Sequence, residues 1–153
     1  MKKALLLLNI CVMVFAACSS DNEETQANDD TIVGHWVSVS RHSKTIFIET
    51  DEIYNEWDDT GDNLSIKLYQ DGTCSRQSIY GGPYLGSYKL LGNELDLFIT
   101  SNSGNTSTFN YVIENYGKDS MVLYYESKGR MWQEQYQQSM YTKTEEHITM
   151  QRK

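Results

Sequence analysis

The chain has 153 residues, of which 39% are hydrophobic, 12% aromatic and 22% charged, and its formal net charge at pH 7 is −8. This acidic balance argues against nucleic acid or an anionic bilayer surface as a partner, because phosphate groups are bound by Lys and Arg. With 17.6 kDa in total, the chain has room for one domain with a sizeable core.

The first segment, residues 1–17, has the order of an export signal. Lys2 and Lys3 precede an almost wholly apolar run from Ala4 to Ala17. About 14 apolar residues are too few for a comfortable membrane span. We therefore interpret residues 1–17 as a signal peptide that is removed during export.

Two small residues and a cysteine, Ala16-Ala17-Cys18, end this run. The ending resembles the lipobox of bacterial lipoproteins, which implies that Cys18 becomes the lipidated first residue of the mature chain. Acyl chains on Cys18 would then attach the protein to a membrane without help from surface charge. The alternative is an ordinary signal peptide cleaved nearby, with Cys18 incidental.

An acidic tether is predicted over residues 18–30. From Ser19 to Asp30 there is no aromatic residue, no β-branched apolar residue and no Lys or Arg, so the segment cannot bury enough surface to order itself. Its start, Ser-Ser-Asp-Asn-Glu-Glu, resembles the acidic export signal that sends Bacteroidota lipoproteins to the outer cell surface. The resemblance implies an outer-membrane lipoprotein exposed at the cell surface; a spacer without any address is the alternative.

From residue 31 to residue 153 the dominant hydrophobic period is two, which is typical of half-buried strands. Tight turns are expected at Asp71-Gly72, Gly92-Asn93 and residues 117–119. The predicted strands are 32–40, 64–69, 73–80, 84–91, 94–99, 109–113, 121–125 and 148–152, with Thr45–Glu49 as an option for another. In residues 130–140, Trp132, Tyr136 and Met140 fit a four-residue helical spacing and also a period of two, so helix or strand is left open. We expect a short helix or an irregular excursion.

Short strands joined by turn residues favour an antiparallel meander that closes into a barrel, because closure removes exposed edges. The predicted fold is therefore all-β, an eight-stranded antiparallel up-and-down barrel preceded by a signal peptide and a flexible tether. The lone Cys74 of this domain cannot form an internal disulfide, and we expect it to be a buried small residue.

Residues at the two ends of the domain carry a family resemblance. Gly34-His35-Trp36, at the start of the first strand, is the Gly-x-Trp of lipocalins, and Arg152 occupies the place where such barrels stack an arginine on that tryptophan. Residues 69–73, 86–95 and 148–153 also resemble the lipocalin-like lipoprotein families of Bacteroidota. The resemblance implies a lipocalin-like barrel that binds a ligand. A guanidinium over Trp36 would gain about 0.5–2 kcal/mol from cation–π attraction.

Few residues suggest chemistry. The acidic segment Glu49–Asp62 is predicted to be a loop at the barrel mouth, and within it Asp58, Asp59 and Asp62 are a weak calcium candidate whose spacing is not that of an EF-hand. A solvated loop is the favoured interpretation. No histidine has a second ligand at metal spacing, and no serine lies in a nucleophile elbow. We expect no catalytic residues, no cofactor and no enzyme activity.

Aromatic residues near loops and strand ends are the remaining indication of function. The candidates for ligand contact are Tyr54, Trp57, Tyr80, Tyr84, Trp132 and Tyr136. The favoured hypothesis is a cell-envelope module that binds a small apolar or amphipathic ligand inside an open barrel. The alternative is an accessory or assembly lipoprotein with a filled barrel, whose aromatic loops contact a protein or a glycan.

Overall fold

The computed structural model describes residues 29–61 and 64–153. The predicted signal peptide, the lipidation site Cys18 and the tether as far as residue 28 lie outside the described residues. The last two tether residues, Asp29 and Asp30, begin the short helix α1. Within the described part, none of the helices has the length and apolar character needed to cross a membrane.

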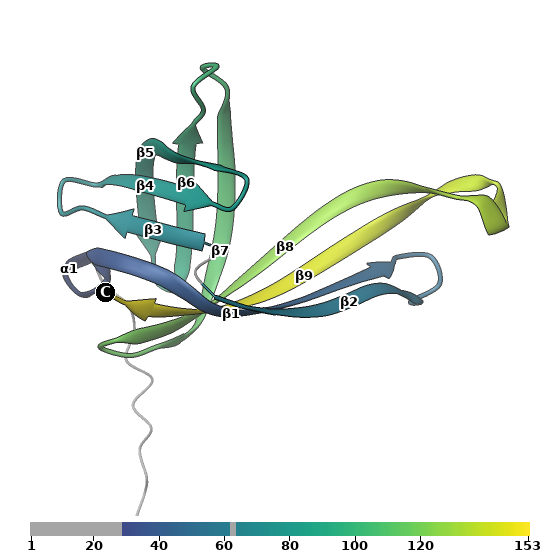
Figure 1. Cartoon of the computed structure of the whole chain (residues 1–153), viewed down its shortest axis with the longest axis horizontal. Helices are drawn as coiled ribbons and strands as arrows, with labels where there is room; N and C mark the ends of the chain where they lie inside the picture. Colours follow the sequence, from purple (N-terminus) through teal and green to yellow (C-terminus); the bar gives the residue numbers. More distant parts are fainter. Residues whose placement is uncertain (1–28, 62–63) are drawn as a thin grey trace, which may run out of the picture.

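Nearly all of the described chain is strand. One four-residue helix, α1, precedes the sheet, and one 3-10 turn, η1, interrupts it late in the chain (Figure 1). The elements are α1 (Asp29–Ile32), β1 (Gly34–Phe47), β2 (Ile53–Thr60), β3 (Leu64–Leu68), β4 (Thr73–Ser78), β5 (Gly81–Leu91), β6 (Glu94–Thr100), β7 (Thr106–Tyr116), β8 (Ser120–Gln133), η1 (Glu134–Tyr136) and β9 (Gln138–Arg152).

The strands close into a barrel. Strands β3 to β9 pair antiparallel in chain order, and β1 pairs with β3 on one side and with β9 on the other. Eight strands therefore form the closed antiparallel up-and-down barrel that the hydrophobic pattern predicts. The three expected turns are found between β3 and β4, between β5 and β6, and between β7 and β8.

A side-chain hydrogen-bonded turn and a closely packed glycine help to hold adjacent strands together. At the β3–β4 turn, the Asp71 carboxylate accepts hydrogen bonds from the Thr73 backbone N–H at 2.9 Å and from the Thr73 hydroxyl at 2.6 Å. Gly86 in β5 is required by close packing, since a Cβ there would lie 1.9 Å from the Phe98 carbonyl oxygen of β6.

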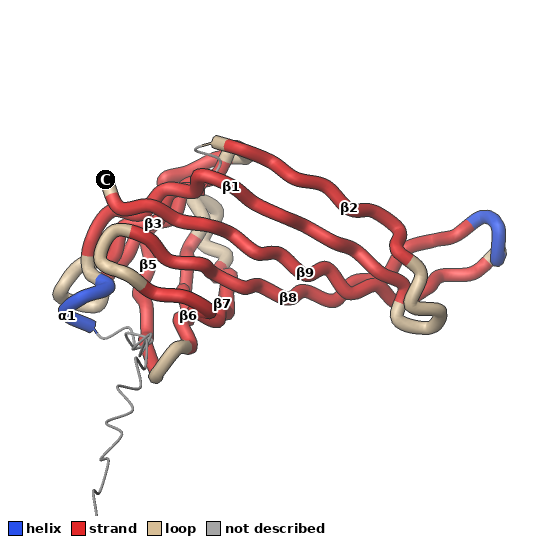
Figure 2. Tube along the Cα trace, turned by 90° about the horizontal axis from the view of Figure 1, so that it is seen from below, coloured by secondary structure: helices blue, strands red, loops and turns tan. Residues whose placement is uncertain are grey.

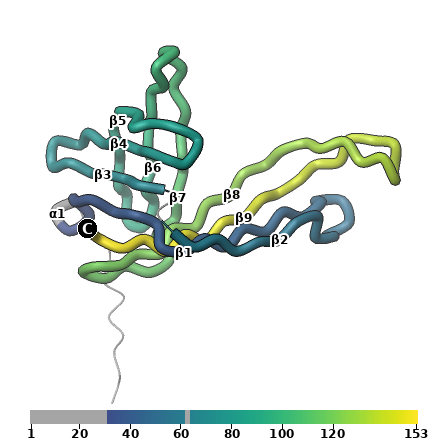
Figure 3. Tube along the Cα trace, viewed as in Figure 1, coloured from purple at the N-terminus to yellow at the C-terminus, as the bar shows by residue number. Residues whose placement is uncertain are grey.

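About a third of the strand residues extend beyond the barrel as an arm, which we define as residues 41–60 and 126–147. In the arm β1 lies between β2 and β9, and β9 is paired with β8, so the order is β2-β1-β9-β8 (Figures 1 and 2). The β8–β9 hairpin reaches furthest and ends in η1 (Figure 3).

Three predictions about the segments that form the arm are wrong. The acidic segment Glu49–Asp62 is not a mouth loop, because its larger part forms strand β2. Thr45–Glu49 is not a separate strand, because β1 continues to Phe47. Residues 130–140 are neither a helix nor an irregular excursion; they are the ends of β8 and β9 joined through the 3-10 turn η1.

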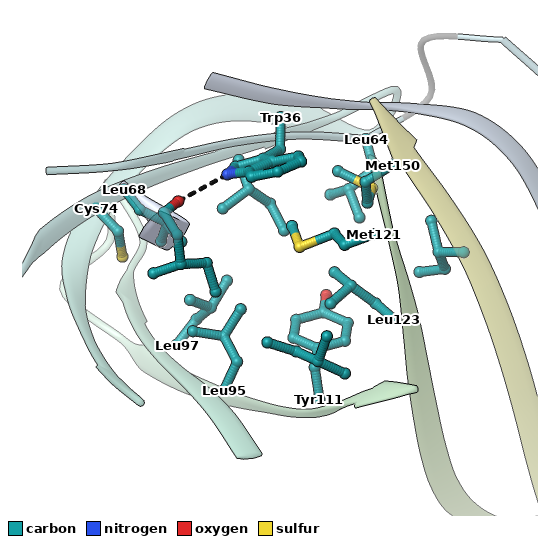
Figure 4. Close-up of a cluster of buried hydrophobic side chains, with 14 of the residues drawn as sticks. Trp36, Leu64, Leu68, Cys74, Leu95, Leu97, Tyr111, Met121, Leu123 and Met150 are labelled. Carbon is teal, nitrogen blue, oxygen red and sulfur yellow. Dashed lines mark hydrogen bonds between the residues drawn. The ribbon is translucent and has the colours of Figure 1, made fainter. Parts of the chain in front are cut away.

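The barrel interior is filled by apolar side chains (Figure 4). These side chains come from α1 and from every barrel strand except β5, whose Tyr84 and Tyr88 are partly buried against the same cluster. The fully enclosed members include Ile32, Trp36, Ile66, Leu68, Leu95, Leu97, Met121, Leu123, Ile148 and Met150. An eight-stranded barrel is just wide enough for side chains to fill its interior.

Candidate functional site

Trp36 and Arg152 close one end of the barrel. The Trp36 side chain is 0% exposed, and its indole N–H donates a hydrogen bond to the Ile32 carbonyl at 2.8 Å (Figure 4). The Arg152 guanidinium carbon lies 4.4 Å from the centre of the Trp36 ring. Arg152 also donates to the carbonyls of Val33, at 3.0 Å, and Thr31. The pair thus ties β9 to β1 and to the segment before it.

Gly34 gives Arg152 the space to do this. A Cβ on Gly34 would lie 3.0 Å from the Arg152 Nη1 atom. The glycine therefore leaves room for the guanidinium. The Gly-x-Trp residues and Arg152 therefore form a structural closure around a fully buried indole.

The opposite end of the barrel contains a cavity of about 350 Å³, which we call the cup. On strand β1, Trp36 lies at the closed end and Arg41 lies in the lining of the cup. Five residues of extended strand span roughly 16 Å between these two positions. The cup is lined by Arg41, Leu64, Arg76, Ser78, Ile79, Tyr80, Phe109, Tyr111, Tyr125, Glu146 and Ile148.

Aromatic rings form one side of the cup. Phe109 and Tyr111 point to the same face of β7 and stack with ring centres 6.5 Å apart. Tyr125 of β8 lies 5.5 Å from Tyr111 and 6.4 Å from Phe109, centre to centre. Tyr111 is buried, and burial raises the pKa of its hydroxyl, although the Arg76 guanidinium opposes that rise. This aromatic cluster therefore presents a neutral, rigid wall.

Arg76 lies against that wall. Its guanidinium carbon is 4.0 Å from the centre of the Phe109 ring. The Arg76 Nε atom is buried and has no hydrogen-bond partner among the described residues. Strand β4 places Arg76 two positions after the buried Cys74 and opposite Ile66 of β3, so the side chain points inward.

Arg41 lies where the cup meets the arm. Its guanidinium is 3.9 Å from Asp59 of β2, 3.9 Å from Glu146 of β9, and 4.5 Å from the centre of the Trp57 ring. Arg41 is thus held by two carboxylates and one indole. It stabilises the junction of β1, β2 and β9 and closes one side of the cup.

The six aromatic candidates fall into three separate places. Tyr80 is 86% exposed at the rim of the cup, and the nearby Tyr84 packs against the core. Trp57 lies in the arm beside Arg41. The other three, Tyr54, Trp132 and Tyr136, are exposed at the far end of the arm. The structure therefore places only Tyr80 in the lining of the cup.

The end of the arm has an open hollow of about 360 Å³ lined by Phe47, Glu52, Ile53, Tyr54, Trp132 and residues 133–135. Phe47 is buried there and meets Tyr54 edge-on, with ring centres 5.4 Å apart. Tyr136 donates a hydrogen bond to Glu52 at 3.3 Å, which links the β8–β9 hairpin to the β1–β2 turn. Trp132 remains 60% exposed.

The weak calcium candidate is not assembled by the described residues. Asp58 and Asp59 are adjacent in β2, so their side chains point to opposite faces. Asp58 accepts a hydrogen bond from His42 at 2.9 Å, whereas Asp59 faces Arg41. Asp62 lies outside the described residues. Within residues 29–61 and 64–153, no three His, Cys, Asp or Glu residues converge on a metal position.

Cys74 is a buried small residue, as predicted. It is 1% exposed, and burial raises the pKa of its thiol to about 11. A thiol with this pKa is almost fully protonated at neutral pH and is a poor nucleophile.

The sequence analysis does not identify the main polar residues of the cup. Arg76, Arg41 and Glu146 each lie on a strand at an inward position of the period-two pattern. A signal for Arg76 exists in the sequence, since Cys74 and Arg76 share a face and an arginine beside a buried position is unusual. Glu146 carries the same signal, since it lies two positions before the buried Ile148. Arg41 carries none, because it is five residues from Trp36 and reaches the inner face only through the register shift between Ser38 and Ser40.

Comparisons with known proteins give little beyond the fold. No family model matches the chain, and no curated protein matches it. Among solved structures, the chain is similar to the crystal structure of a lipocalin-like protein from Bacteroides uniformis, with 13% identity over 82% of this chain and 100% of the other, and a TM-score of 0.46. We base no conclusion about ligand or activity on a similarity of this size.

Proposed function

We propose that this protein is a lipocalin-like lipoprotein of the cell envelope that binds a small amphipathic ligand in the cup without catalysis. The observation that carries the proposal is the cup itself, an aromatic-walled cavity of about 350 Å³ above an otherwise filled barrel. Ligand sites are typically concave and mostly apolar, with a few polar groups, and 300 Å³ is near their lower limit. A long acyl chain does not suit this volume.

Native mass spectrometry of the protein purified from its own envelope, with organic extraction, tests this function. We expect a co-purifying small molecule that is lost from Ser78→Trp, since Ser78 lines the cup and an indole there would fill it. Ser103→Trp, in the exposed β6–β7 turn, is the matched control and should retain the molecule. Retention by both variants would mean that the molecule binds elsewhere.

The proposed attachment to the outer membrane depends on lipidation of Cys18. The apolar leader and the Ala-Ala-Cys ending support it. Whether the lipidated protein faces the cell exterior depends on the acidic residues that follow Cys18, and protease accessibility on intact cells distinguishes the two faces.

A second candidate function, partner binding, is favoured by the arm. Strand β2 and the outer half of β8 pair on one side only, so their backbone groups are free to add a strand, and exposed edges of this kind are natural templates for pairing. A polypeptide strand can extend the regular ladder of hydrogen bonds along these edges, which the hydroxyl groups of a glycan do not reproduce, so we take a protein as the partner.

Crosslinking through a photoreactive residue at Trp132 in intact cells tests this second function. A discrete crosslinked protein, absent when the residue is placed at Ser103 instead, would support it. A loss of crosslinking at position 132 when an oligosaccharide is added would indicate a glycan ligand.

A further inference from the structure

Arg76 is the arginine of the cup whose described neighbours are the Phe109 ring and the Tyr111 side chain and include no carboxylate partner. Arg41 has carboxylates at 3.9 Å from both Asp59 and Glu146. In contrast, no carboxylate among residues 29–61 and 64–153 lies within 4.0 Å of Arg76. The charged residues that line the cup are Arg41, Arg76 and Glu146, and Glu146 and Asp59 both lie beside Arg41, so neither of these carboxylates is paired with Arg76.

The surroundings of Arg76 make that charge costly without a counter-ion. The side chain is partly buried and lies against the Phe109 ring. Its buried Nε atom has no partner among the described residues, a feature that Arg41 and Arg152 share. A charge taken out of water is stable only when it is paired or fully hydrogen-bonded. Cation–π contact with one ring compensates for only part of this loss.

The same surroundings suit an anion. The Phe109 ring centre lies 4.0 Å from the guanidinium carbon and restricts where the guanidinium can lie. A guanidinium binds a planar oxyanion through two parallel hydrogen bonds. Phe109 and Tyr125 beside it, and Ile79 and Tyr80 at the rim, offer apolar surface to the rest of a ligand.

A purely structural role for Arg76 is the competing explanation. Arg152 at the other end of the barrel has such a role, and there the guanidinium donates to the carbonyls of Thr31 and Val33 while it stacks on Trp36. Arg76 stacks similarly but borders an open cavity in place of chain termini. This difference favours a ligand over a structural brace.

We propose that the ligand of the cup is an amphipathic anion, with a carboxylate, sulfonate or similar oxyanion bound by Arg76 and a flat apolar body held against the aromatic wall. This inference rests on the proposed function, because it names the ligand class of the same cup. Neutral molecules of the same shape should bind more weakly.

Two fluorescent probes that differ only by the anionic group test the proposal. They are 1-anilinonaphthalene-8-sulfonate and its neutral counterpart N-phenyl-1-naphthylamine, titrated into the purified protein. We expect the sulfonate probe to bind the wild type with one site per chain. Arg76→Gln should weaken it at least tenfold and change the neutral probe less than twofold. Arg76→Lys, which keeps the charge but loses the planar fork, should fall between.

Arg130→Gln is the matched control. Arg130 also stacks on an aromatic ring, 5.3 Å from the centre of Tyr141, but it lies in the arm away from the cup. This variant should leave both affinities unchanged, and equal melting temperatures establish that Arg76→Gln remains folded. Should Arg76→Gln unfold, Arg76→Lys provides the test by the same ratio of the two probes.

The outcomes separate this inference from the proposed function. If both probes bind and Arg76→Gln weakens them equally or not at all, the cup binds ligands but Arg76 does not select anions, and the inference is wrong. If neither probe binds at the cup, as shown by unchanged binding in Ser78→Trp, the proposed function fails together with it.

Discussion

Replacing Trp36 with alanine should destabilise the barrel more than any other single truncation of its closed end. Trp36 is completely buried and lies between the core and Arg152. A buried tryptophan removes about 150–250 Å² from water, which at about 25 cal/mol per Å² is worth roughly 4–6 kcal/mol. Because alanine keeps part of that surface and neighbours relax, we expect a loss of about 3–5 kcal/mol in the free energy of unfolding.

Chemical denaturation in urea, followed by circular dichroism, measures that loss. The midpoint should fall while the slope against urea concentration stays constant, as for a change in stability alone. For a domain of this size, about 1 kcal/mol corresponds to roughly 3–6 °C, so the melting temperature should fall by about 10–30 °C.

Trp36→Phe is the informative control for this prediction. It keeps a ring under the Arg152 guanidinium but loses volume and the N–H donor to the Ile32 carbonyl. We expect a cost of about 1–2 kcal/mol, near that of one hydrogen bond and a small cavity. A Trp36→Ala protein that melts within about 3 °C of the wild type would refute the assignment of Trp36 as the plug of the closed end.

Three further predictions concern other parts of the chain. Gly86→Ala should destabilise by more than about 2 kcal/mol, because the new Cβ would collide with the Phe98 carbonyl, whereas Gly104→Asn, in open space, should cost less than about 1 kcal/mol in the same urea titration. Thiol labelling of Cys74 at pH 7.5 should be at least a hundredfold slower in the native protein than in the denatured protein, because burial raises the thiol pKa from 9.0 to about 11 and each pKa unit lowers the thiolate fraction tenfold. The labelling rate of the native protein should increase as the pH rises toward 11. Equal rates in the two states would contradict the burial of Cys74. Cys18→Ser should move the protein from the membrane fraction to the soluble fraction, and continued sedimentation with membranes would disprove lipid anchoring.

The barrel could be predicted because each of its strands has one face of buried apolar side chains and one face of polar, solvent-exposed side chains. Leu64, Ile66 and Leu68 alternate with polar residues, and all three are buried. Asp71-Gly72 and Gly92-Asn93 then mark where the chain reverses. Alternation and turn chemistry together specify neighbouring strands in an antiparallel meander, and closure follows from the number of strands.

The arm could not be predicted because its strands lack that contrast. In β2 the two faces carry Asp58 with Glu56 and Asp59 with Trp57, and most of the strand is exposed. A dense acidic segment of this kind is typical of a loop, and only its pairing with β1 makes it a strand. The same holds for the ends of β8 and β9, which satisfy each other's backbone groups and bury little.

The filled interior explains why ligand size is restricted at the cup. From Trp36 toward the cup, the inward positions are occupied by branched and sulfur-containing side chains. This packed region ends at Leu64, Tyr111 and Ile148, which are the buried residues in the lining of the cup. Beyond them the inward residues become Arg41, Arg76 and Glu146, whose charged ends need contact with water or a partner. Such side chains cannot pack against one another as apolar ones do, so the cavity opens where the charges begin. The cavity and its polarity therefore have one origin, and under the proposed function a ligand that fits the volume also contacts Arg76.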